Sequence, residues 1–121
     1  MNKILIVDDS LFMRKVISNI LQDIKGIKLL EASSGKEALI LFNKEHPDLV
    51  LLDIVMPGGE EEGVRVLERI LEKNRRAKVV MISAVGQEII IEECKKLGAK
   101  DYIVKPFDEE KVINIVQKHL K

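Results

Sequence analysis

Four short apolar stretches, in which hydrophobic residues do not alternate with polar ones, stand out along the chain of 121 residues. Such a stretch is typical of a β-strand that is covered on both faces, as in a parallel sheet packed between helices. Each stretch is followed by side chains that are suited to chemistry. The stretches and their end groups are 3–7 with Asp8 and Asp9, 48–52 with Asp53, 78–82 with Ser83, and 101–104 with Lys105.

Apolar residues at spacings of three and four predict amphipathic helices between these strands. The first helix is expected over Ser10 to Ile24, with Ser10 as its N-cap and Lys25-Gly26 at its end. In the second, Ser34 and Glu37 form a capping box, with the Glu37 side chain returning to the amide of Ser34. The later boundaries are expected near Glu45 and Asn74, at Gln87 and Leu97, and from Asp108 or Glu109 to the C-terminus.

With Ile27 to Ala32 as a further strand, five strands alternate with five helices through short loops. This alternation predicts an α/β fold, a doubly wound parallel sheet with helices on both faces, built as one domain over residues 1–121. In such sheets, ligands bind just beyond the carboxyl ends of the strands. We therefore expect the polar side chains that follow the four strands to meet at one edge of the sheet.

Composition excludes several classes of function. Twenty basic and twenty acidic residues balance, with a pI near 6.7, so nothing indicates a nucleic-acid partner. Cys94 is the only cysteine, which excludes an intramolecular disulfide and fits a reducing compartment. Signal-peptide and membrane-length apolar segments are absent from the sequence. We expect a soluble, cytoplasmic protein without a membrane partner.

The acidic end groups predict a cation or a shifted pKa. Two carboxylates at 4 Å repel each other by about 4 kcal/mol at an effective dielectric constant near 20. Either one of the acids takes a proton, or a hard divalent cation such as Mg²⁺ lies among them. Lys105 and Ser83 would add a cation and a hydroxyl for phosphoryl oxygens, which favours phosphoryl transfer onto Asp53. As simpler alternatives, Asp9 would cap a helix, Ser83 would form a turn, and Lys105 would be a solvated loop residue.

These end groups resemble those of the CheY-like receiver domains of two-component response regulators, along the whole chain. The matching residues are Asp8-Asp9, Asp53 with Met56-Pro57, Ser83-Ala84, Tyr102 and Lys105-Pro106-Phe107. The resemblance implies a flavodoxin-like (βα)5 fold with strand order 2-1-3-4-5, an order that spacing alone does not give. Some stretches are also similar to stand-alone chemotaxis regulators. These are residues 10–14, 81–88 and 102–107.

The resemblance also implies a role for each site residue. Asp53 would accept a phosphoryl group from a histidine kinase or a histidine phosphotransfer protein, and Ser83 and Lys105 would hold the phosphoryl oxygens. Mg²⁺ would be bound by Asp8, Asp9, Asp53 and the backbone carbonyl of Val55. On phosphorylation, Ser83 would move toward the phosphate and Tyr102 would turn inward, which would reshape the face of helix four, strand five and helix five. The Lys105-Pro106 peptide would be cis.

The function implied is that of a single-domain response regulator, a monomer that catalyses only its own phosphorylation and dephosphorylation. Its target would be a downstream protein, such as a flagellar or archaellar switch component, in chemotaxis. A phosphorelay intermediate and a phosphate-independent binding module remain as alternatives. A phosphatase of the haloacid-dehalogenase type would need Asp-x-Asp after the first strand, and that motif is absent.

Three features depart from the family or add to it. The loop from Met56 to Gly63 is two residues longer and more acidic than is usual, which predicts altered metal affinity or partner contact. Val55 and Val85 are apolar, so we expect no side-chain assistance to hydrolysis and no unusually fast dephosphorylation. Ile89 to Ile91 span about 200° around a helix axis, so at least one of them should be exposed.

Overall fold

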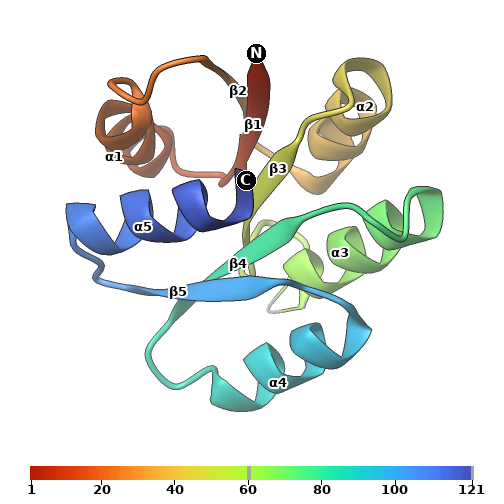
Figure 1. Cartoon of the computed structure of the whole chain (residues 1–121). Coiled ribbons are helices and arrows are strands. Elements are labelled where there is room, and N and C mark those ends of the chain that lie inside the picture. The colour runs from red at the N-terminus through yellow and green to blue at the C-terminus, as the bar shows by residue number, and fades with distance from the viewer. Residues whose placement is uncertain (60, 121) are drawn as a thin grey trace.

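The structure is a computed structural model that describes residues 1–59 and 61–120, over which five strands and five helices alternate (Figure 1). The strands are β1 (Asn2–Val7), β2 (Ile27–Ala32), β3 (Leu49–Asp53), β4 (Val79–Ala84) and β5 (Asp101–Lys105). The helices are α1 (Leu11–Leu21), α2 (Gly35–Glu45), α3 (Glu62–Lys73), α4 (Glu88–Leu97) and α5 (Glu109–Leu120). The predicted number, type and order of the elements are confirmed.

All strand pairings are parallel, and the sheet has the order β2-β1-β3-β4-β5, as the resemblance implied. The chain leaves β1 toward one edge to form β2, and then returns to the other side of β1 to form β3. This reversal makes a crevice between the carboxyl ends of β1 and β3. The register aligns the strand ends, since Val7 pairs with Leu52, Asp53 with Ile82, and Ala84 with Lys105.

Successive residues of each strand point to opposite faces, which gives the sheet two cores. Helices α1 and α5 cover one face and α2, α3 and α4 cover the other (Figure 1). On β3, for example, Leu51 packs under α1 and α5 and Leu52 under the other three helices. Full burial of such a side chain stabilises the fold by about 1.5–3 kcal/mol. The sheet is thus a rigid base for the groups at its carboxyl edge.

Two details of the helix ends differ from the sequence prediction. Ser10 caps α1 as expected, accepting a hydrogen bond from the Met13 amide at 3.1 Å, but α1 ends at Leu21 and not at Ile24. A turn follows, in which the Ile24 amide donates to the Leu21 carbonyl, so Gly26 lies too far along to end the helix. At the start of α2, Ser34 accepts from the Glu37 amide as predicted.

The second bond of that capping box was assigned to the wrong amide. The Glu37 carboxylate accepts from the Ser33 amide at 2.9 Å, one residue before the cap. Two other expectations are confirmed, the cis peptide between Lys105 and Pro106 and the exposure of Ile89. Among the described residues, none of the helices is both long enough and apolar enough to cross a bilayer.

Candidate functional site

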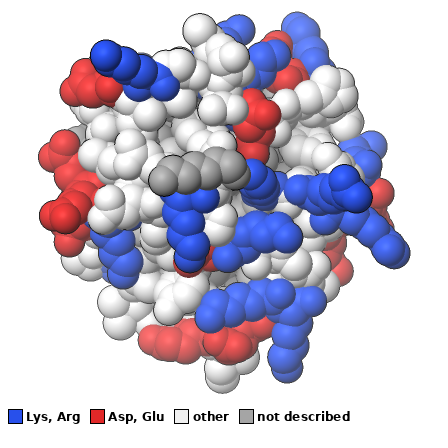
Figure 2. Space-filling model, in the orientation of Figure 1, with Lys and Arg blue, Asp and Glu red and all other residues white. Residues whose placement is uncertain are grey.

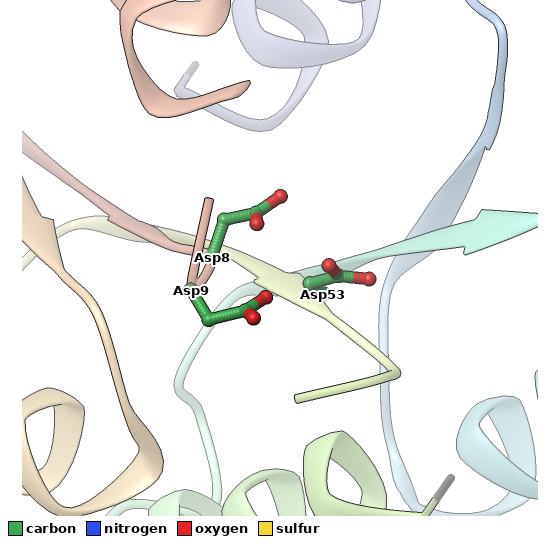
Figure 3. A group of neighbouring side chains, drawn as sticks. All are labelled: Asp8, Asp9 and Asp53. Atoms are coloured by element: carbon green, nitrogen blue, oxygen red, sulfur yellow. The ribbon is translucent and has the colours of Figure 1, made fainter. Parts of the chain in front are cut away.

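Three carboxylates converge at the crevice between β1 and β3. Asp8 and Asp9 follow β1, Asp53 ends β3, and one oxygen from each lies within 4.8 Å of the others (Figure 3). Asp8 and Asp53 are buried, while Asp9 is exposed at the rim. Because Ser10 caps α1, the alternative in which Asp9 merely serves as that cap is wrong.

Lys105 supplies the positive charge of the site. Its Nζ lies 3.2 Å from Asp53 Oδ2 and 3.5 Å from Asp8 Oδ2, so one ammonium bridges the two buried acids. Lys105 ends β5, two strands away from Asp53, and its side chain reaches across the end of β4. The alternative of a solvated loop lysine is therefore wrong.

Burial dominates the electrostatics of Asp53. It raises the pKa of the Asp53 carboxyl from an ordinary value of 3.8 to about 6, although the charge of Lys105 opposes the rise; the neighbouring Asp8 adds to it. One cation thus compensates two buried acids only in part. A further positive charge would relieve the remaining repulsion.

Backbone groups hold the two buried carboxylates in place. The Ser10 amide donates to Asp8 Oδ1 at 2.9 Å, and the Val55 amide lies 3.4 Å from Asp53 Oδ1. The second oxygen of each acid is the one that faces Lys105. Each carboxylate is therefore oriented from both sides, as a metal-binding or nucleophilic group requires.

Two positioning residues were missed by the sequence analysis. Arg14 donates from Nη1 to the Asp8 carbonyl at 2.6 Å and from Nε to Glu31 Oε1 at 2.9 Å, which ties β1, α1 and β2 together at the site. Gly63 donates its amide to the Ile54 carbonyl at 2.8 Å, and a Cβ there would lie 2.6 Å from Ile54 Cα. Only a glycine lets α3 start against the end of β3. The small residue at a helix start was the available signal.

Ser83 lies inside β4, which runs on to Ala84, so the alternative of a turn-forming serine is wrong. Its side chain is fully buried, and its hydroxyl finds no hydrogen-bond partner among the described residues. In the sheet register Ser83 comes one residue after Ile82, the partner of Asp53. A buried hydroxyl without a partner costs free energy. It is suited to donate to an anion that arrives beside Asp53.

Tyr102 is half-buried on β5, and the Nζ of Lys95 on α4 lies 4.8 Å from the centre of its ring. This is within the range of a cation–π interaction. A cavity of about 240 Å³ opens beside the ring, lined by α4 and the strands β4 and β5. The implied switch residue thus has a partner on α4 and space next to it.

The long loop after Pro57 is anchored at both ends. Met56 and Gly59 form an isolated bridge, and Arg65 donates from Nη2 to the Gly58 carbonyl at 2.9 Å and from Nε to Glu62 Oε1 at 3.1 Å. Glu60 lies outside the described residues. The loop expected between β3 and α3 is present, and Arg65 holds its outer part.

Three apolar side chains are exposed shortly after the ends of β3 and β4 and at the start of α4. Val55 is 42% exposed and Val85 75% exposed, and Ile89 at the start of α4 is 86% exposed. None of these side chains can donate or accept a proton for an attacking water. These three side chains thus offer contact surface and no acid or base.

The donor set fits a hard divalent cation. Mg²⁺ accepts carboxylate oxygens while it keeps water or phosphate oxygens as its other ligands, and three carboxylates meet at this edge of the sheet. Asp8, Asp9 and Asp53 would hold it, and the excess of buried negative charge at Asp53 is the observation that agrees with this donor set.

Fold and site together define an α/β protein with three carboxylates and a lysine at the switch point of its sheet. The model of the response regulator receiver domain matches residues 4–117. The chain belongs to this family.

Among curated relatives, the chain is 44% identical to the chemotaxis protein CheY of Listeria monocytogenes, over the full length of both. It is 36% identical to sporulation initiation phosphotransferase F of Bacillus subtilis, over 98% of this chain and 93% of that one. Among solved structures, CheY4 of Vibrio cholerae is 30% identical with a TM-score of 0.88, and 99% of each chain is covered. NtrX of Brucella abortus has a TM-score of 0.90 at 33% identity, and the match spans 99% of this chain and 27% of NtrX.

Proposed function

We propose that this receiver domain is a phosphoacceptor, in which Asp53 takes a phosphoryl group from a phosphohistidine of a kinase or a phosphotransfer protein. The observation that supports it best is the convergence of the three carboxylates with Lys105. In the reaction an Asp53 oxygen forms a bond to phosphorus, and the bond from phosphorus to the donor nitrogen breaks with its electron pair. The product is an acyl phosphate.

Each residue of the site has one task in this reaction. Asp8 and Asp9, with Asp53, would hold Mg²⁺, which would supply positive charge to the transferring oxygens. Lys105 moves from its two carboxylate partners toward a phosphoryl oxygen, and the Ser83 hydroxyl donates to another. The Lys105 charge is already within 3.2 Å of the nucleophile, so the protein needs little reorganisation to use it.

We propose further that the phosphorylated protein signals through the face made by α4, β5 and α5 and has no other catalytic activity. Chemotaxis is the pathway we favour, because the relative from Listeria bears that name over its full length. A phosphorelay role is the second candidate, since the sporulation phosphotransferase is also similar over most of its length.

Mass spectrometry of the intact protein tests the acceptor role. Incubation with acetyl phosphate and Mg²⁺ should add one phosphoryl group to the wild type. The adduct should be lost in Asp53→Asn and in a sample with EDTA. An adduct that persists in Asp53→Asn would place the acceptor elsewhere, and its absence in the wild type under conditions that preserve acyl phosphates would favour a phosphate-independent binding module.

Capture experiments with and without beryllofluoride distinguish the two pathways. Capture of a flagellar or archaellar switch protein by the beryllofluoride form alone would support chemotaxis. Capture of a histidine phosphotransfer protein and no switch protein would support a relay.

A further inference from the structure

A second polar pocket lies at the opposite edge of the sheet. It has a volume of about 500 Å³ and is formed where β1, β3 and β4 begin and where α2, α3 and α5 end. From Asp48 to Asp53 the chain rises along β3 by five residues, or about 16 Å, so this pocket is separate from the acidic site. Nothing in the proposed phosphoryl transfer uses it.

The charge of this pocket is opposite to that of the acidic site. Lys73, Arg76 and Lys78 line it, with Asp48 as the one carboxylate among its lining residues. Figure 2 shows Lys and Arg side chains gathered on this side of the molecule, across the middle and right of the view, where α3 ends and β4 begins. Within residues 1–59 and 61–120, none of the three cations forms a salt bridge.

Helix ends explain these cations only in part. Lys73 lies in the last turn of α3, where a cation stabilises the negative end of the helix, and Lys78 donates from Nζ to the His119 carbonyl of α5 at 2.8 Å. Arg76 lies two residues beyond the C-cap Asn74, outside the range of that effect. Its backbone is nevertheless held, because the Arg76 amide donates to Asn74 Oδ1 at 2.9 Å. The Arg76 residue is exposed, and a guanidinium can bind a phosphate with two parallel hydrogen bonds.

The remaining lining suits a ligand larger than a simple ion. His46 and His119 are among the lining residues, although the His119 ring pairs through Nε2 with Asp101 Oδ2 at 3.0 Å. The volume lies within the range of small-molecule sites, about 300–1,000 Å³. His46 has a left-handed backbone, with φ 50°, which turns the chain sharply from α2 into the wall of the pocket. The lining cations thus border a space large enough for a base and its phosphates.

From this arrangement we infer that the pocket at the amino edge of the sheet binds a phosphate ester of nucleotide size, with Arg76 and Lys73 on its phosphates. With three cations and one carboxylate among the lining residues, the pocket favours a polyphosphate over a neutral ligand. The inference does not depend on the phosphorylation of Asp53.

Nuclear magnetic resonance titration of the full chain tests it. The ¹⁵N-labelled protein is titrated in EDTA with adenosine 5′-diphosphate, pyrophosphate or adenosine, without metal or phosphoryl donor. The diphosphate should shift the amides of Asn2, Ala77 and Lys78, which border the pocket, and leave those of Asp9 and Val55 in place. It should bind more tightly than pyrophosphate, and adenosine should not bind measurably.

The two adjacent arginines give a matched pair of variants. Arg76→Gln should weaken binding of the diphosphate about fivefold, as expected for loss of one exposed ionic contact. Arg75→Gln removes the same charge from a residue that does not line this pocket, and should change the affinity less than twofold. Lys73→Gln is a second lining variant, in case Arg76→Gln perturbs the loop.

Three results would overturn the inference. Equal losses in the Arg75 and Arg76 variants would show diffuse attraction without a site. Equal affinity for pyrophosphate and the diphosphate would exclude a ligand of nucleotide size. Shifts confined to Asp9 and Val55, or none at millimolar ligand, would exclude this pocket.

Discussion

Replacing Asp53 with asparagine should stabilise the metal-free protein at neutral pH. The Asp53 carboxyl is buried, and its pKa is raised from 3.8 to about 6, with Lys105 opposing and Asp8 adding to the effect of burial. A shift of this size corresponds to at most about 3 kcal/mol, at 1.36 kcal/mol for each pKa unit. Asparagine removes the buried charge but also loses the ion pair with Lys105. We therefore expect a net gain of about 1–2 kcal/mol.

The sign of the pH dependence follows from the direction of the shift. Below pH 3.8 the carboxyl is protonated in both the folded and the unfolded protein, so its charge costs nothing. As the pH rises from 3.8 to about 6, the unfolded protein ionises first, and the folded wild type loses stability relative to it. The advantage of the asparagine variant should therefore grow over this window and stay constant above it.

Urea unfolding of both proteins in EDTA, at a series of pH values from 4 to 8, measures this advantage. Asp23→Asn, which changes an exposed carboxyl, is the matched control and should show no such growth. Mg²⁺ should then stabilise the wild type more than the variant, because binding to the folded state alone adds RT ln(1 + [Mg²⁺]/Kd). If the advantage of the variant is independent of pH, or if the variant is less stable than the wild type at pH 8, the buried charge of Asp53 does not destabilise the folded protein.

Three further substitutions test contacts in and around the site. Gly63→Ala places a Cβ 2.6 Å from Ile54 Cα, so it should lower the free energy of unfolding in urea by about 2–3 kcal/mol. No loss of stability would mean that α3 can shift freely. Lys95→Met removes the cation over Tyr102, the only tyrosine in a chain without tryptophan, and with it a charge that attracts the iodide anion. Iodide should therefore quench the fluorescence of Tyr102 less strongly, and unchanged quenching would contradict the contact. Lys105→Met removes the charge that most strongly opposes the effect of burial on the pKa of Asp53. That pKa should therefore rise above about 6 in a carbon-13 titration, and phosphorylation by acetyl phosphate should slow. An unchanged pKa would exclude the ion pair.

The hydrophobic pattern predicted the helices and strands because burial of an element determines which of its neighbouring positions are apolar, and this can be seen in the local sequence. The bounds of β2, residues 27–32, and the α2 end at Glu45 agree with the prediction. Helix ends were less predictable where a competing turn was available. After Leu21, the turn that Ile24 closes ends α1 before the glycine that the pattern indicated.

The candidate site was predictable as a set of strand ends, but its geometry was not. A parallel sheet brings all carboxyl ends to one edge, yet spacing cannot tell which strands are neighbours, and the order had to come from the resemblance. Arg14 and Gly63 were missed because each contacts a backbone carbonyl, at Asp8 and Ile54, and the pattern of side chains does not show which carbonyls lie nearby. Such contacts follow from tertiary packing, not from local sequence.

Strand β5 joins the acidic site to the face that we expect to signal. Lys105 at its end contacts Asp53, and Val104 pairs in register with Ser83. Val104 and Tyr102 both line the cavity of about 240 Å³ below α4, since residues two apart share one face of a strand. A phosphoryl group on Asp53 that draws Lys105 and Ser83 toward itself would therefore act on the strand that carries Tyr102. We propose that the ring moves into this space on phosphorylation. The contact with Lys95 would oppose that movement, and a bias of a few kcal/mol from one added charge would be enough to overcome it.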